Sequence, residues 1–201
     1  MGMKKFINIL IFLFIFALYF VTFLMIYDNF RERKLNSQEK NAIELFENKI
    51  AKKEQTPSNT NQAYRISYRG YTILGQLQIP KIGLDTVILK EHTYAAMSIG
   101  AIKTYGVDLN EKGGFVISGH NFRGKSNFLY NIKNLKNNDI IRIIDNKGRT
   151  MEYKVYAVSR YVSPTDTSYI PSPKTNDYYL ALVTCENGGK SRIVVRAHIV
   201  E

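Results

Sequence analysis

Cys185 is the only cysteine of the chain, and it stands at the end of an apolar, strand-like run at 178–185. A polar loop at 186–191 follows, and a second strand-like run then begins at Arg192. A single thiol has no internal disulfide partner. A thiol at a strand end, beside a cation and with a histidine elsewhere in the chain, is a candidate nucleophile.

Two arginines compete for the place beside this thiol. If the two runs pair as an antiparallel hairpin, Arg192 lies across from Cys185 at the mouth of the loop. Arg196 lies four residues further along, about 13 Å away at roughly 3.3 Å per residue. Alternation places Arg192, Val194, Arg196 and His198 on one face of the second strand. The other face carries the predicted core positions Ile193, Val195, Ala197 and Ile199.

A thiol with these neighbours has the groups needed to attack a peptide carbonyl. A guanidinium stabilises the resulting oxyanion and orients the substrate, and a histidine takes and returns the proton. His120 follows an apolar strand at 115–118 and a glycine, where scaffolds often present functional groups. His92 lies in a polar stretch, and His198 lies near the terminus on an outward face. Position therefore favours His120 as the general base and acid.

The elements that must position these residues begin with an uncharged apolar run at 6–27, after a short tail at 1–5. As a helix it would span about 33 Å, enough to cross a bilayer core of about 30 Å. The run is longer than the apolar region of a cleaved signal peptide, so we predict a retained membrane anchor. Basic residues flank it on both sides, so the positive-inside rule leaves its orientation open. They are Lys4, Lys5, Arg31, Arg33 and Lys34.

Residues 28–62 are predicted to form a stalk helix and a flexible linker. Ile43, Phe46 and Ile50 have helical spacing, which indicates an amphipathic helix that either packs on the domain or serves as a stalk. The polar stretch at 52–62 is typical of a linker. The catalytic domain is then predicted at 63–201.

Within that domain, many short strands separated by turn residues favour an all-β fold, either a barrel or a sandwich. Short helices are predicted at 94–99 and 127–135. The net charge is +11, and from residue 57 onward 19 Lys and Arg stand against 11 Asp and Glu. This balance favours anionic surfaces or polymers, but no recognisable nucleic-acid module accompanies it.

Several segments together resemble the sortases, the membrane-anchored cysteine transpeptidases of Gram-positive bacteria. Leu-Val-Thr-Cys at 182–185 with Arg192 is similar to the family's Thr-Leu-x-Thr-Cys signature and following arginine. Ser-Gly-His-Asn at 118–121 is similar to the strand end that carries the family's histidine. The stretches at 75–82 and 135–141 resemble other parts of the domain. One departure is visible, because Ala181 stands where the signature has its first threonine.

The resemblance implies a closed eight-stranded β-barrel with short helices. It also implies that Cys185 attacks the Thr-Gly bond of an LPxTG-like sorting signal on a surface protein, that His120 protonates the leaving amine and that Arg192 supports the substrate and the oxyanion. An amine of a cell-wall precursor or of another protein would resolve the thioacyl intermediate. The N-terminus would be cytoplasmic, the domain extracytoplasmic and the first helix in membrane lipid. Thr184, Ala181 and Asn121, which neighbour these residues, are assigned to substrate binding.

Among the classes of sortases, elimination of the others favours a class D-like or class A-like anchoring enzyme. Such an enzyme is expected to require no cofactor. Calcium, which some class A members bind, has weak support, because four acidic residues in candidate loops are better explained as solvating those loops. They are Asp108, Glu111, Asp166 and Asp177. Two other functions stay open: a hydrolytic cysteine peptidase with the same nucleophile, and a non-catalytic, membrane-tethered β-domain that binds anionic wall polymers.

Overall fold

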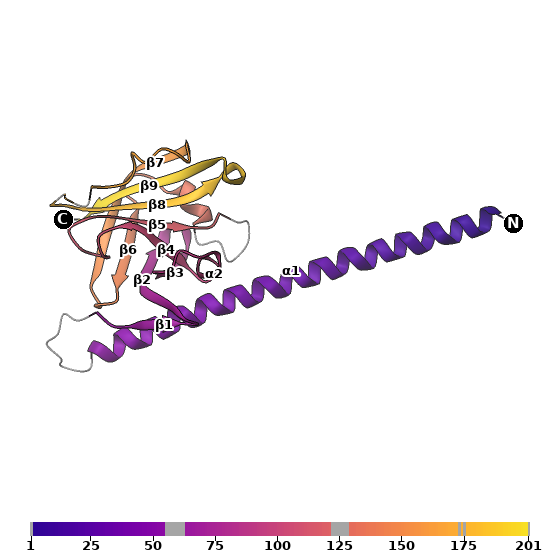
Figure 1. Ribbon diagram of the computed structural model, residues 1–201, viewed down its shortest axis with the longest axis horizontal. Helices are drawn as coiled ribbons and strands as arrows, with labels where there is room; N and C mark the ends of the chain where they lie inside the picture. Colours follow the sequence, from indigo (N-terminus) through magenta and orange to yellow (C-terminus); the bar gives the residue numbers. More distant parts are fainter. Residues whose placement is uncertain (1, 55–62, 122–128, 173, 175, 201) are drawn as a thin grey trace.

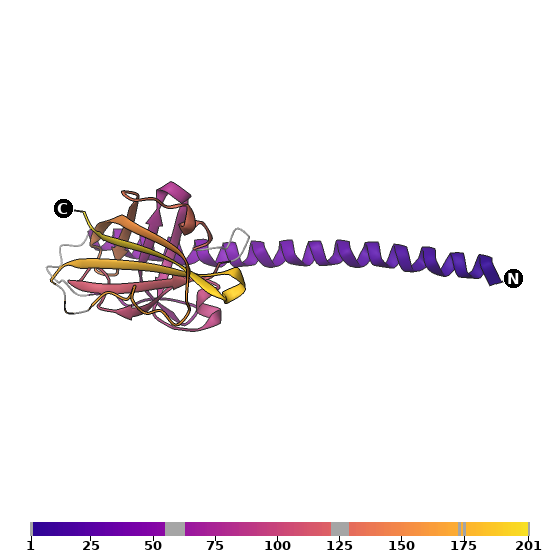
Figure 2. The same cartoon turned by 90° about the horizontal axis from the view of Figure 1, so that it is seen from above.

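The computed structural model describes residues 2–54, 63–121, 129–172, 174 and 176–200. A long N-terminal helix crosses the outside of a β-barrel and then runs far beyond it (Figure 1; Figure 2). The strands are β1 (Ile66–Tyr68), β2 (Tyr71–Ile79), β3 (Leu84–Leu89), β4 (Ala101–Gly106), β5 (Gly113–Gly119), β6 (Ile140–Asp145), β7 (Thr150–Val162), β8 (Tyr178–Glu186) and β9 (Ser191–Ile199). The helices are α1 (Gly2–Glu54), α2 (Tyr94–Met97) and the 3-10 turns η1 (Pro80–Ile82), η2 (Tyr130–Asn134) and η3 (Asn187–Gly189).

In the described residues, eight strands form a ring in the order β2-β3-β4-β5-β8-β9-β7-β6, and the pairing of β6 with β2 closes it. The short strand β1 pairs with the first part of β2, outside the ring. The predicted closed eight-stranded barrel is thus confirmed. The two predicted helices are shorter than expected: α2 covers only 94–97, and the second is a 3-10 turn at 130–134, with 127 and 128 outside the described residues.

The barrel interior is apolar, because alternate side chains of each strand point inward. On β9, Ile193, Val195 and Ala197 are fully buried, as alternation predicts. Phe115 and Tyr153 meet edge to face at the centre of this core, with ring centroids 5.8 Å apart. This packing fixes the register of the strands whose ends carry the candidate site.

The helix α1 is continuous from the predicted anchor through the predicted stalk. Its apolar N-terminal part is exposed, and α1 is the one helix of the described residues that is long and apolar enough to cross a membrane. It continues to Glu54, two residues past the start of the predicted linker, and 55–62 lie outside the described residues.

The second half of α1 packs on the barrel and does not stand free as a stalk. Ala42 and Phe46 are fully buried in an apolar cluster that includes Ile73, Val87 and Leu89 from β2 and β3. Burying a phenylalanine side chain stabilises by about 2–3 kcal/mol. Of the two alternatives for the amphipathic segment, packing on the domain is therefore confirmed.

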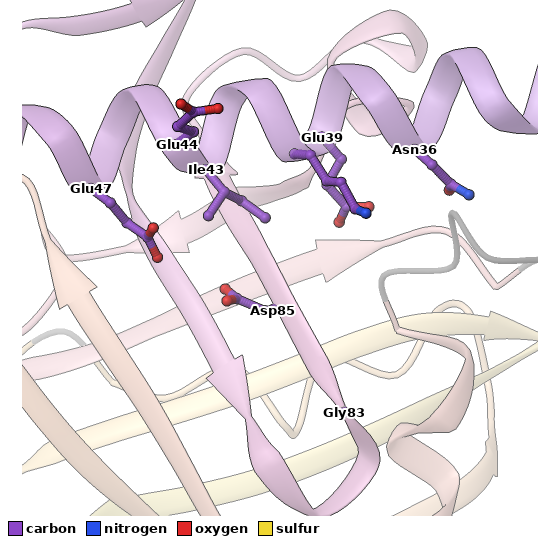
Figure 3. A pocket seen from close by; sticks show the side chains of 8 residues that line it. Asn36, Glu39, Ile43, Glu44, Glu47, Gly83 and Asp85 are labelled. Atoms are coloured by element: carbon purple, nitrogen blue, oxygen red, sulfur yellow. The ribbon is translucent and has the colours of Figure 1, made fainter.

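Carboxylates line the polar side of this helix–barrel contact (Figure 3). The buried Gln76 of β2 donates from Nε2 to Glu47 Oε1 of α1 at 2.9 Å and to Asp85 Oδ1 of β3 at 2.8 Å. A cavity of about 610 Å³ opens beside them, lined in part by Glu39. Burial is the main cause that raises the pKa of Glu39 to about 7 and also raises the pKa of Asp85. The helix is thus held by an apolar contact beside acidic groups whose charged forms are disfavoured there.

Candidate active site

The strands β5 and β8 end at the same edge of the barrel because they run parallel. Their register joins Gly113 to Tyr178 at one end and Gly119 to Thr184 at the other. The residue after Gly119 is His120, just beyond β5, and the residue after Thr184 is Cys185, near the end of β8. Two residues that the sequence places in separate segments therefore occupy neighbouring backbone positions at one edge of the barrel, and Cys185 is exposed to solvent.

The strands β8 and β9 form the predicted antiparallel hairpin, in which Cys185 lies directly opposite Arg192. The strands are longer than expected, and only 187–190 connect them, because Glu186 pairs with Ser191. Arg192 Nη1 donates to the carbonyl of Gly189 at 2.9 Å and to that of Ser191 at 3.0 Å. The turn therefore holds one end of the guanidinium, on the strand position paired with Cys185.

His120 is the histidine that the fold brings to Cys185. His92 Nε2 lies 2.6 Å from the carbonyl oxygen of Lys103, and His198 lies six residues along β9 from Arg192, opposite Tyr179. The ring of His120 packs against the ring of Tyr94, with centroids 4.8 Å apart.

Partial burial lowers the pKa of His120 below its ordinary value of 6.5. The imidazole is therefore mostly neutral at pH 7 and able to accept a proton.

Two of the predicted substrate-binding residues tie the strand ends together. Thr184, which is almost fully buried, donates from Oγ1 to the carbonyl of Gly119 at 2.8 Å. Asn121 donates from Nδ2 to the carbonyl of Cys185. These bonds link the end of β5 to the end of β8, and so fix where His120 and Cys185 stand. The substrate contacts assigned to the two side chains stay predictions.

Sequence reasoning missed one ion pair behind the nucleophile. Glu186, only 7% exposed, accepts hydrogen bonds from the guanidinium of Arg160 and, at 2.9 Å, from the backbone N–H of Tyr161. The pair joins the end of β8 to the end of β7. In the sequence, the only signal for this ion pair is the acidic residue immediately after the cysteine, and that residue alone does not identify its partner.

Ala181, the third predicted substrate-binding residue, lies on the outer face of β8, the face that also carries Cys185. With Val116, Val183 and Val194 it forms a buried outer cluster. Tyr169 and Ile170, from the connection between β7 and β8, cover this cluster. This cover explains why Val194 is almost fully buried although alternation turns it away from the barrel core.

A cavity of about 330 Å³ opens at the end of the outer cluster that is further from Cys185. Its lining includes Tyr156, Tyr179, Ala181 and Arg196 from the strands and Tyr169 from the covering connection. Arg196 lies opposite Ala181 in the β8–β9 register, as the hairpin prediction requires. The thiol and the cavity thus lie on the same face of β8, and the connection that carries Tyr169 and Ile170 covers the outer cluster between them.

The four acidic loop residues do not converge on one another. In the described residues, no group of three His, Cys, Asp or Glu side chains has a geometry that could hold a metal ion. Glu111 forms ion pairs with Lys147 at 2.7 Å and Arg149 at 2.8 Å. Asp166 accepts from the backbone of Ser168, and Asp177 from that of Tyr178. Glu111 thus joins its loop to the turn between β6 and β7, whereas Asp166 and Asp177 bind their own segments, and calcium dependence stays an untested prediction.

The fold and this edge define a class: closed eight-stranded barrels that present a cysteine, a histidine and an arginine on adjoining strand ends. Solved structures of this architecture are sortases. A sortase D5 transpeptidase from Clostridium perfringens superposes with a TM-score of 0.64 at 25% identity, covering 82% of this chain and 99% of that one. A lid mutant of sortase A from Corynebacterium diphtheriae gives 0.59 at 29% identity, covering 65% and 72%.

The chain belongs to the sortase family, since the family model described as Sortase domain matches residues 77–200. Sortase A of Bacillus anthracis is 28% identical over 130 residues, a match that covers 64% of this chain and 60% of that relative's length. The family consists of cysteine transpeptidases. Similarity to both an A and a D sortase is compatible with the predicted class D-like or class A-like type.

Proposed function

We propose that this protein is a membrane-anchored transpeptidase that cleaves an LPxTG-like sorting signal between Thr and Gly and joins the protein to a cell-wall amine. The observation that carries the proposal is the meeting of Cys185, His120 and Arg192 on one barrel edge in a chain of the sortase family. Under this proposal the N-terminal helix lies in the lipid with its N-terminus cytoplasmic, and the barrel is extracytoplasmic.

Each of the three side chains has a distinct step. His120, neutral at pH 7 because burial lowers its pKa, takes the thiol proton of Cys185. The sulfur attacks the threonine carbonyl, and the N–H groups of Arg192 that are not bound to the turn donate to the developing oxyanion. The imidazolium then protonates the glycine amine as the C–N bond breaks, which leaves a thioacyl enzyme. An incoming amine attacks this thioester and returns the thiol.

The outer cluster supports an extended mode of substrate binding. The signal residues before the scissile bond would follow the outer face of β8 from Cys185 toward Ala181. Tyr169 and Ile170 cover the cluster, so their connection would move aside to admit the signal and would then form one wall of that path. The small side chain of Ala181 leaves room where the family's signature has a threonine.

Mass spectrometry of the full chain in detergent, mixed with sorting-signal peptides, tests this proposal. We expect an acyl adduct on Cys185 whose mass corresponds to the peptide up to its threonine, and loss of the adduct in Cys185→Ala. Adding oligoglycine or a diamino-acid peptide should convert the adduct to a joined product. Adduct formation with hydrolysis that no acceptor changes would instead identify a hydrolytic peptidase.

The third function, binding of anionic wall polymers without catalysis, makes the opposite prediction. In that case Cys185→Ala would leave all function intact, and polymer binding would weaken steeply with salt. Absence of any adduct with every peptide, together with salt-sensitive polymer binding, would overturn the transpeptidase proposal.

A further inference from the structure

Arg196 gives the cavity beyond the outer cluster a positive wall that the proposed chemistry does not use. It lies on the outer face of β9, opposite Ala181 on β8 and Ala157 on β7. Its guanidinium is 5.9 Å from the centre of the Tyr156 ring, which also lines the cavity. The cavity therefore combines aromatic walls with one cation.

The hydrogen-bonding capacity of this guanidinium is largely unused. Its bond to a side chain is a long one, from Nη2 to the hydroxyl of Ser159 at 3.4 Å, and its Nε is buried without an acceptor. Among the described residues, no carboxylate lies within ion-pair distance of Arg196. Asp166, the acidic residue of the nearby connection, accepts from the backbone of Ser168, and the charge of Arg196 contributes to its lowered pKa without a direct ion pair. A guanidinium has five N–H donors in a fork that fits a carboxylate.

The distance from the nucleophile identifies which substrate residue reaches this cation. Ala181 and its partner Arg196 lie four residues down the hairpin from Cys185 and Arg192, about 13 Å away at roughly 3.3 Å per residue. An extended peptide with its threonine carbonyl at the thiol covers the same length with its fifth residue, counted back from the scissile bond. In an LPxTG-like signal, that is the residue immediately before the leucine.

We propose that Arg196 is a specificity-determining residue that selects sorting signals with an aspartate or glutamate immediately before the leucine position. The inference rests on the proposed function, because it assumes that the signal lies along β8 with its threonine at Cys185. The leucine would lie over the outer cluster between Val183 and Ala181, and the preceding carboxylate, level with Ala181, would pair with the guanidinium. Neither contact involves the groups that make or break bonds.

Matched peptides test the charge preference. Four signals are compared: Glu, Gln or Lys immediately before Leu, and Gln there with a Glu placed after the glycine. In the full chain we expect kcat/KM for the first Glu peptide to exceed that for Gln by about tenfold, as for a partly shielded arginine–carboxylate pair. The Glu after the glycine should give no gain, because it lies on the leaving side.

Variants assign the preference to one side chain. Arg196→Gln should cleave the Glu and Gln peptides equally, and Arg196→Glu should prefer Lys. Lys154→Gln removes a cation from β7, in register with His198 and outside the cavity lining, and should keep the tenfold preference. Thermal melting of each variant identifies any that fails to fold, and Arg196→Lys, which keeps the charge, should retain part of the preference.

Binding of the same labelled peptides to Cys185→Ala, followed by fluorescence anisotropy, separates this inference from the proposed function. A Glu preference in binding that disappears in Cys185→Ala/Arg196→Gln supports the inference even if no peptide is cleaved. Equal binding and cleavage of the Glu and Gln peptides by proteins with Arg196 intact would overturn it. So would a Glu preference that survives Arg196→Gln.

Discussion

Replacing Glu39 with glutamine should stabilise the docking of α1 on the barrel above neutral pH and leave it unchanged in acid. Glu39 faces the cavity between α1 and β3, with Glu44, Glu47 and Lys40 on its own helix and Asp85 across from it (Figure 3). Burial is the main cause of its raised pKa. The nearby hydroxyl of Thr86 on β3 lowers the pKa in part, and the negative charge of Asp85 raises it further.

The size and sign of the effect follow from the pKa of Glu39. The docked carboxyl has a pKa of about 7 against an ordinary 4.5, and each pKa unit corresponds to about 1.4 kcal/mol, so the penalty is at most about 3.5 kcal/mol. The docked state favours the protonated form. The stability that protonated Glu39 contributes to the docked state is therefore fully present below pH 4.5 and is lost as the pH rises through 7. Because glutamine has no charge to desolvate, the gain in stability from Glu39→Gln should grow as the pH rises from 4.5 through 7 and should stay at its full value above that.

The assay is thermal unfolding of the full chain in detergent at pH 5 and pH 8, with hydrogen exchange of the α1 amides at 36–46 as a local probe. We expect Glu39→Gln to raise Tm and slow exchange at pH 8, with little change at pH 5. Glu44→Gln is the matched control, since Glu44 is on the same helix segment but is exposed. An equal gain at both pH values, or the same gain in the control, would refute burial of the Glu39 charge as the cause.

Two further predictions concern the candidate site and the helix contact. His120→Ala should lower peptide cleavage by about 100-fold or more and should change the pH profile of Cys185 alkylation, because it removes the proposed proton acceptor. In the unsubstituted protein, cleavage should persist below pH 6.5, because the lowered pKa of His120 keeps the base neutral there; an alkylation profile identical with and without His120 contradicts coupling of the two groups. Phe46→Ala should cost about 3–5 kcal/mol of stability in chemical denaturation, because it leaves a cavity against β2 and β3. Phe12→Ala in the exposed part of α1 is its control and should have no such effect.

The hairpin half of the candidate site is predictable from local sequence, and the histidine half is not. A short polar loop between two apolar runs is enough to put Cys185 opposite Arg192, and alternation is enough to turn Arg196 to the same face. The pairing of β5 with β8 is different, because Gly119 and its partner Thr184 are 65 positions apart and the strands between them complete the ring elsewhere. Position suggested His120, but only the closed barrel brings it beside the thiol.

Packing between elements explains the remaining differences. Nothing local indicates that Arg160 pairs with Glu186, or that Tyr169 and Ile170 cover Val194, because these contacts join segments whose approach depends on the whole barrel. The continuity of α1, in contrast, is visible in the sequence. No glycine or proline occurs between Gly2 and Pro57, so the sequence contains no break between the predicted anchor and the predicted stalk.

Because α1 is continuous, its contact with the barrel determines the height and orientation of the candidate site relative to a membrane. With residues 6–27 in the bilayer as proposed, Asn36, the first residue to line the contact cavity, lies nine residues or about 13 Å above its edge. The strands β8 and β9 lie across the barrel from α1 (Figure 1). Loosening the contact should therefore leave the pairing of Cys185, His120 and Arg192 intact while freeing the barrel to tilt. Cleavage of small soluble peptides should depend only on the arrangement of these three residues. Joining of membrane-held substrates should depend on that arrangement and also on the contact between α1 and the barrel.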